Sequence, residues 1–382
     1  MKRTSLVVLI VCACFVSVAW GQQPTRQCTN NWSEFHRTNM QRWNPCEKLL
    51  NVKNVGNLSV KWTYNTLYYY VNTSPSVANG VAYIIADQMY ALNARTGAEL
   101  WSYPIGSYRY TSSPAVANGV VYVGSIDYNV YALNAKTGAL LWSYTTRNAV
   151  ASSPAVANGV VYVGSEDGTV YALNASTGAT MWSYATGGNI DSSPAVANGV
   201  VYVGSRDKNV YALNANTGAK VWSYATGAAV YSSPAVANGV VYVGSADKNL
   251  YALNARAGAK LWSYRTGDEY GSSPAVANGV VYIGSGDAVM NGSVYALNAR
   301  TGAKLWNYRT GAAVVSSPAV ANGVVYIGAE AYDNHVYALS ARTGTKLWSY
   351  QTGGGFNSSP AVVNGMVYVG SVDDNVYAFG LK

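Results

Sequence analysis

Carboxylates at a repeating position are the most obvious candidates for chemistry in this 382-residue sequence. A ring of them could hold cations, but aspartate is also favoured in tight turns, because its side chain accepts hydrogen bonds from the local backbone. Catalytic pairs need two acids in different environments, which copied positions do not provide. We therefore interpret the series as turn residues and predict no catalytic or metal-binding residue among them: Asp127, Asp167, Asp207, Asp247, Asp287, Asp333 and Asp373.

The two histidines, His36 and His335, offer no second source of chemistry. They lie far apart in the sequence, and neither has a partner at the spacing of a metal site. A Ser-His-Asp arrangement is equally unsupported by the pattern. We expect both histidines to be ordinary surface or packing residues.

Residues 1–21 are typical of a secretory signal peptide, with a basic start, a short apolar stretch and small residues at Ala19 and Gly21. The apolar run is shorter than the ~20 residues that a membrane-spanning helix needs. Cleavage near Gly21 is therefore favoured over an uncleaved anchor, and over lipidation at Cys14. We predict an exported protein that is periplasmic or secreted.

Cys28 and Cys46 are the cysteines that would remain after cleavage, and both lie in residues 22–57, which we interpret as an N-terminal arm. A cysteine pair in an exported protein predicts a disulfide. Closing this short loop would stabilise the fold by roughly 3 kcal/mol in the chain-entropy model. The formal charge of +8 is dispersed singly along the chain, so a nucleic-acid partner is not expected.

One unit is copied along most of the chain, and self-similarity at a fixed period indicates a repeat architecture. A period near 40 residues suits a four-stranded propeller blade. Each unit contains four segments rich in Val and Tyr, separated by Asn-Gly, Asp-containing and Thr-Gly turns, as expected for antiparallel strands. The tryptophan of the fourth strand marks the period: Trp62, Trp101, Trp142, Trp182, Trp222, Trp262, Trp306 and Trp348.

Strand counting predicts how the ring closes. The tryptophan strand at Val60–Tyr64 precedes every other repeat element, whereas the last unit, Ser358–Leu381, ends without one. The extra strand at the start of the repeats therefore supplies the strand that the last unit lacks. We therefore predict an all-β, eight-bladed propeller over residues 58–382, closed by antiparallel pairing of Val60–Tyr64 with Val376–Gly380. Proline opens the first strand of each unit and cannot donate to a ladder, so this strand is predicted to be the inner edge.

The hairpin Ala132–Trp142 reads Ala-Leu-Asn-Ala-Lys-Thr-Gly-Ala-Leu-Leu-Trp and recurs seven times, the last copy ending at Trp348. It resembles the signature of the pyrroloquinoline-quinone (PQQ) repeat family, Ala-x-Asp-x-x-Thr-Gly-x-x-x-Trp, with Asn in place of Asp. The resemblance implies that the eight repeat tryptophans dock each blade against the next. The family includes quinoprotein dehydrogenases, which bind the quinone and Ca²⁺. It also includes non-catalytic propellers, such as a lipoprotein of the bacterial outer-membrane barrel assembly machinery.

Function does not follow from the fold. The dehydrogenases build their site on insertions between blades and commonly carry an adjacent Cys-Cys disulfide over the cofactor. This chain has no adjacent cysteine pair after the first 21 residues, and its longest insertion is about four residues. We therefore expect neither PQQ nor Ca²⁺ to be a cofactor.

The copies differ mainly on one face, where the Asp turns and the connections between blades emerge. Tyr and Arg are enriched in recognition hot spots, and loops on a rigid scaffold commonly bind ligands. Neutral drift of exposed loops after duplication is the alternative interpretation. The candidate binding residues are Tyr69, Tyr70, Tyr108, Arg109, Tyr110, Arg147, Asp191, Tyr231, Asp268, Glu269, Tyr270 and Phe356.

The sequence thus favours a non-catalytic, monomeric scaffold that binds an envelope or extracellular protein or a glycan through this face. A PQQ-dependent dehydrogenase is the alternative from another class. A carbohydrate-binding module is the third hypothesis, because exposed tyrosines can stack on sugar rings.

Overall fold

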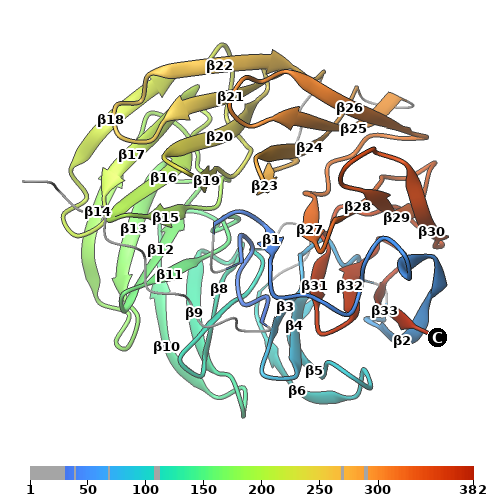
Figure 1. The fold of residues 1–382 in the computed structure, drawn as a ribbon. Coiled ribbons are helices and arrows are strands. Elements are labelled where there is room, and N and C mark those ends of the chain that lie inside the picture. The colour runs from blue at the N-terminus through green and yellow to red at the C-terminus, as the bar shows by residue number, and fades with distance from the viewer. Residues whose placement is uncertain (1–30, 38–39, 68, 107–111, 268–270, 288–290) are drawn as a thin grey trace, which may run out of the picture.

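The computed structural model describes residues 31–37, 40–67, 69–106, 112–267, 271–287 and 291–382. The predicted signal peptide, its cleavage site and Cys28 lie outside the described residues. Eight four-stranded antiparallel blades form a closed ring around a central channel (Figure 1). The predicted eight-bladed propeller is confirmed. None of the helices in the described ranges is long and apolar enough to cross a membrane.

Seven blades are continuous in sequence, and each orders its strands from the channel outward. Blade 1 contains β3 (Ser76–Ala78), β4 (Val81–Ile85), β5 (Gln88–Asn93) and β6 (Glu99–Pro104), and blade 2 contains β7 (Ala115–Ala117), β8 (Val120–Gly124), β9 (Asn129–Asn134) and β10 (Leu140–Thr145). Blade 3 contains β11 (Ala155–Ala157), β12 (Val160–Gly164), β13 (Thr169–Asn174) and β14 (Thr180–Ala185), and blade 4 contains β15 (Ala195–Ala197), β16 (Val200–Gly204), β17 (Asn209–Asn214) and β18 (Lys220–Ala225). Blade 5 contains β19 (Ala235–Ala237), β20 (Val240–Ser245), β21 (Asn249–Asn254) and β22 (Lys260–Arg265). Blade 6 contains β23 (Ala275–Ala277), β24 (Val280–Asp287), β25 (Asn291–Asn298) and β26 (Lys304–Thr310), and blade 7 contains β27 (Ala319–Ala321), β28 (Val324–Gly328), β29 (His335–Ser340) and β30 (Lys346–Gln351).

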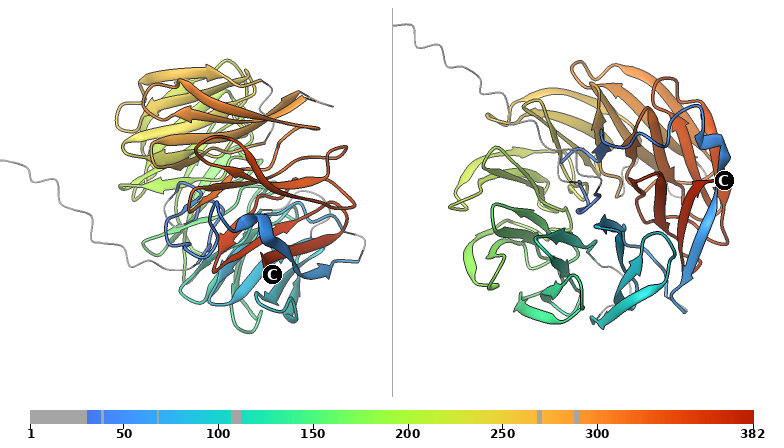
Figure 2. Two further views of the ribbon diagram at one scale, coloured as in Figure 1. Left: turned by 45° about the vertical axis from the view of Figure 1, so that its right-hand side comes forward. Right: turned by 60° about the horizontal axis from the view of Figure 1, so that its bottom comes forward.

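Blade 8 is assembled from both ends of the chain, as predicted. It combines β31 (Ala361–Val363), β32 (Met366–Gly370) and β33 (Asn375–Leu381) with the N-terminal strand β2 (Leu58–Asn65). In the antiparallel ladder Trp62 faces Ala378 and Tyr64 faces Val376. Figure 2 shows β2 beside the C-terminal strand at the outer rim. A short 3-10 helix, η1 (Val55–Asn57), leads into β2.

The tryptophans link each blade to the next. In blade 2, the indole N–H of Trp142 and the hydroxyl of Tyr122 both donate to the carbonyl of Ala175 in blade 3, at 3.0 Å each. The Thr-Gly turn fits beneath the indole: a Cβ at Gly178, whose φ is +72°, would lie 2.7 Å from Trp142 Cε3. Each repeat tryptophan makes the equivalent bond, to Ala94, Ala135, Ala175, Ala215, Ala255, Ala299, Ala341 and, from Trp348, to Leu58.

The first strands form the inner edge, as predicted, and those of neighbouring blades contact one another around the channel. The described residues of the N-terminal arm up to Asn44 lie along this edge, in the centre of the ring, and the arm then runs outward to β2 at the rim (Figures 1 and 2). Its carbonyls accept N–H groups from the middle valines of successive first strands: Val116 to Ser33, Val236 to Met40, Val276 to Gln41 and Val320 to Arg42, at 2.7–3.0 Å.

The arm ends this path as β1 (Trp43–Asn44), which pairs in parallel with β27 of blade 7. The Asn44 side chain then donates to Val362 O in blade 8 at 2.8 Å. The arm therefore covers the inner strands and at the same time supplies the acceptors that their buried backbone donors need. Nothing in its sequence predicted this position. Because Cys28 is outside the described residues, the Cys28–Cys46 disulfide stays a prediction.

Candidate functional site

A cavity of about 910 Å³ opens at the channel mouth, on the face where the blades are connected; we call it the cup. Phe35 of the arm contributes to its lining. The wall comes from the connections between blades and from the turns between second and third strands. The lining residues are Phe35, Asn72, Ala151, Glu166, Asp191, Ser193, Arg206, Tyr231, Ser233, Gly271, Ser273, Val315, Glu330 and Asn357.

One position of the repeat supplies half of this wall. It is the residue immediately before each Ser-Ser-Pro or Thr-Ser-Pro, which we call the mouth position. It differs between most blades although its neighbours are copied. The mouth residues that line the cup are Asn72, Ala151, Asp191, Tyr231, Gly271, Val315 and Asn357.

A closed ring of serine hydrogen bonds holds the mouth positions in place. The backbone N–H of the second serine in each unit donates to the serine hydroxyl of the next blade, and the bond from Ser359 to Ser74 closes the circle. All eight distances lie between 2.8 and 3.0 Å. Eight mutually supporting bonds at a buried edge make the cup a rigid frame.

Three of the four charged side chains in the described lining lie in blades 3 and 4 or in the connection between them, whereas Glu330 lies in blade 7. Arg206 makes a bidentate ion pair with Asp191, at 2.6 Å from Nε and 2.8 Å from Nη2. Its guanidinium also lies 5.3 Å from the ring centroid of Tyr231. Burial raises the pKa of Glu166, and the Asp191 charge raises it further, while Arg206 lowers it. Burial also raises the pKa of Glu330 across the cup. Three carboxylates therefore face one cation.

Beneath the cup, the arm buries a cation and a histidine. Arg42 is fully buried and donates to Pro318 O and Pro360 O at 3.0 Å each, and to Phe35 O. Burial lowers the pKa of its guanidinium to about 9. Burial, and secondarily the Arg42 charge, lowers the pKa of His36 to about 3. Neither ring nitrogen makes a hydrogen bond of good geometry to the described residues, and the nearby backbone of Ser193 partly opposes the lowering of the pKa. His36 is thus a neutral packing residue.

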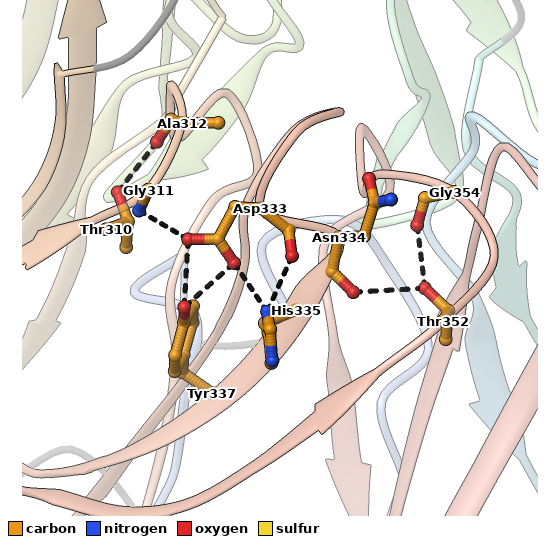
Figure 3. Close-up of polar contacts among 9 residues, drawn as sticks. All are labelled: Thr310, Gly311, Ala312, Asp333, Asn334, His335, Tyr337, Thr352 and Gly354. Atoms are coloured by element: carbon orange, nitrogen blue, oxygen red, sulfur yellow. Dashed lines mark hydrogen bonds and ion pairs between the residues drawn. The ribbon is translucent and has the colours of Figure 1, made fainter.

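The repeated aspartates tie the blade connections to the turns. Asp333 accepts from the Tyr337 hydroxyl at 2.8 Å and from the N–H of Gly311, which follows the outer strand of the previous blade (Figure 3). His335 Nδ1 lies 2.9 Å from the same carboxylate. The described residues contain no group of three or more side chains suited to hold a metal. The other aspartates of the series except Asp287 make the same two bonds, as expected for turn residues.

The predicted binding residues differ in where the structure places them. Asp191 and Tyr231 line the cup, whereas Arg147 and Tyr70 are exposed outside it, and Tyr69 packs partly against the core. The residues outside the described ranges are Tyr108, Arg109, Tyr110, Asp268, Glu269 and Tyr270.

The prediction for Phe356 is wrong, because its side chain is fully buried. It occupies the apolar position just before the mouth residue and packs over Gly328, where an added Cβ would lie 2.3 Å from Phe356 Cβ. Val150, Ile190 and Val230 fill this position in other blades and are also buried. The sequence prediction also missed Glu166, Arg206 and Glu330. Each lies two residues after the end of a second strand, at another variable position of the repeat.

The fold and this site define an eight-bladed β-propeller of the PQQ-repeat-like class with an arm in its channel. A family model described as "Beta-alanine-activating enzyme, beta-propeller" matches residues 71–290 and 159–379. The chain belongs to this propeller family. No curated protein matches the sequence.

Solved structures with the same fold include proteins of different function. A quinohemoprotein alcohol dehydrogenase from Pseudomonas putida is 20% identical, with a TM-score of 0.80 over 92% of this chain and 80% of that one. BamB from Moraxella catarrhalis is also 20% identical, with a TM-score of 0.72 over 85% and 99%. The computationally designed Ika8 protein is 18% identical, with a TM-score of 0.73 over 82% and 97%. Identities this low show the fold alone.

Proposed function

We propose that this protein is an exported, non-catalytic binding scaffold whose recognition site is the cup. The observation that carries the proposal is the coincidence of sequence variation with the cavity: the mouth position lines the cup, while the flanking serines are copied. Loops that vary on a rigid frame are the usual location of binding sites. A cavity of about 910 Å³ is also within the size range of ligand sites.

The charge of the cup indicates the chemistry of the ligand. Glu166, Asp191 and Glu330 outnumber Arg206, so the described lining is net negative although the whole chain carries +8. The ion pair with Arg206 neutralises Asp191 and leaves the two partly buried glutamates. A cationic group would relieve their desolvation through charge-assisted hydrogen bonds. We therefore expect a basic side chain of a partner protein, or a small amine, to enter the cup.

A PQQ-dependent dehydrogenase is the less favoured function. PQQ carries several carboxylates, and the described lining of the cup, which is net negative and has Arg206 as its one cation, provides no cationic set to receive them. The described lining also offers no three-ligand metal group for Ca²⁺. The residues present therefore do not fit this cofactor.

Affinity capture with matched variants tests the proposal. The cup variant combines Glu166→Gln, Glu330→Gln and Tyr231→Ser, whereas the rim variant changes exposed lysines on the opposite face to Gln. The cup variant should lose capture of a basic partner, and the rim variant should retain it. If glycans bind instead and depend on Tyr231, the carbohydrate-binding hypothesis replaces this one. The rim residues are Lys136, Lys220, Lys260 and Lys304.

A further inference from the structure

Glu166 and Glu330 occupy the same position of the repeat, the second residue after the Tyr-Val-Gly or Tyr-Ile-Gly that ends the second strand. The backbone N–H of Glu166 donates to Ala149 O at 2.8 Å, in the connection that enters blade 3. The N–H of Glu330 makes the equivalent bond to Ala313 O at 2.9 Å, in the connection that enters blade 7. The same backbone geometry therefore presents both side chains, and both line the cup.

The two glutamates come from opposite walls of the cup. Blades 3 and 7 are four apart in a ring of eight, and Figure 1 shows their second strands, β12 and β28, across the channel from each other. No other blade with the Tyr-Val-Gly or Tyr-Ile-Gly motif carries an acid at this position, which holds Ile126, Arg206, Ala246, Gly286 and Val372. Glu166 and Glu330 are thus one pair of equivalent carboxylates, half a turn of the ring apart.

Both carboxylates lack a direct partner in the described part of the chain. Glu330 makes neither a hydrogen bond nor an ion pair there, and burial alone raises its pKa. Glu166 has Asp191 and Arg206 near it without a hydrogen bond to either. Two nitrogens of Arg206 are already used by its bidentate pair with Asp191. Each glutamate is therefore a partly desolvated acid whose ionised form a cation would stabilise.

The arm presents an aromatic ring between the two walls. Phe35 is partly exposed and lines the cup, and the described residues of the arm up to Asn44 lie in the centre of the ring. Arg42 holds Phe35 in place, because it donates to Phe35 O and its guanidinium lies 4.6 Å from the ring centroid. An aliphatic chain can pack against such a surface while its charged ends reach polar groups on either side.

We propose that the cup binds a linear dication, a flexible chain that pairs one cationic end with Glu166 and the other with Glu330. The inference rests on the function proposed above and specifies the ligand that the cup takes. The chain lies against Phe35, and each end makes charge-assisted hydrogen bonds to one carboxylate. A single cation satisfies only one wall, so two linked charges of matching separation bind more tightly than one. A free diamine and a pair of lysines in one peptide are the two sources of this chemistry.

Calorimetric titration with two series of probes tests the proposal. The first series contains linear diamines of increasing length, each compared with the monoamine of the same length. The second contains peptides with two lysines separated by glycines, each compared with the peptide in which one lysine is replaced by glutamine. At the best length, the two-charge probe should bind with one-to-one stoichiometry and about 10- to 100-fold more tightly than its one-charge control, as expected for an added hydrogen bond to a charged group. The series that binds more tightly identifies the source.

Single substitutions distinguish an opposed pair from a general attraction of cations. Glu166→Gln and Glu330→Gln should each remove the preference for two charges, because either change leaves this carboxylate on one wall only. Glu99→Gln is the matched control and should bind like wild type, since Glu99 is exposed on the outer strand β6. The proposal is overturned if neither series prefers two charges, or if the preference survives either cup substitution. If the preference is absent while the cup variant still loses its basic partner, this inference fails and the proposed function stands.

Discussion

Lowering the pH should weaken the fold through His36, the histidine that the arm buries beneath the cup. Its folded-state pKa is about 3, against 6.5 for a free histidine. As the pH falls below about 6.5, the unfolded chain takes up a proton that the folded protein does not, so stability is lost until about pH 3. Each pH unit in this window costs about 1.4 kcal/mol, so the loss from pH 6.5 to 4.5 is about 2 to 3 kcal/mol.

Urea unfolding at a series of pH values measures this loss. In His36→Leu the titrating group is absent, so the variant should lose about 2 to 3 kcal/mol less than wild type between pH 6.5 and 4.5. His335→Gln is the matched control, because it removes the other histidine of the chain. If wild type and His36→Leu show parallel pH dependence, His36 is not buried as a neutral group and the position of the arm is wrong.

Two further pairs of substitutions test the docking of the blades by urea unfolding. Tyr162→Phe removes a 3.0 Å hydrogen bond to Ala215 O and should lower the free energy of unfolding by about 1 kcal/mol. Tyr326→Phe removes a buried hydroxyl that has no partner among the described residues and should be neutral or stabilising. If Tyr326→Phe destabilises the protein more than Tyr162→Phe does, the contacts described between the blades are wrong. Gly159→Ala should cost about 1 kcal/mol, because its φ is +77° but nothing lies within 4 Å. Gly178→Ala adds a contact with the neighbouring indole and should cost clearly more, and equal costs would show that the indole does not pack on this turn.

The fold could be predicted from the sequence because its information is repeated. A single blade is ambiguous, but eight copies fix the period, the four strands and the two orphan strands at the ends. The closure of the ring followed from strand counting alone, and the predicted segments of β2 and β33 do pair with each other. Turn chemistry was equally local, since Asn-Gly and Thr-Gly need positive φ wherever the hairpins occur.

The cup was predicted only in part, because its residues come together through the curvature of the ring. Two of the candidate residues, Asp191 and Tyr231, line the cavity, and their role in binding stays a prediction. Phe356 was misplaced by one residue: side chains alternate in extended segments, so the residue before the mouth position points into the core. An alignment of the repeats would have shown this, because the residue before the mouth position is also apolar in other blades, as in Val150 and Ile190.

The arm could not be predicted, because it belongs to no repeat. Its contacts are mainly backbone carbonyls that accept from the inner strands, and such contacts place little constraint on side-chain type. Among the described side chains of the arm, Arg42 is a fully buried cation that donates to carbonyls of blades 7 and 8. A lone arginine in an arm without periodicity gives no indication of that position.

The most direct test of the central claim is quantitative affinity capture from an envelope extract by wild type, the cup variant and the rim variant defined above. The account predicts that wild type and the rim variant retain the same partner, that the partner presents a basic segment, and that the cup variant loses it. Retention by the cup variant, together with loss in the rim variant, would contradict the account and place recognition on the opposite face.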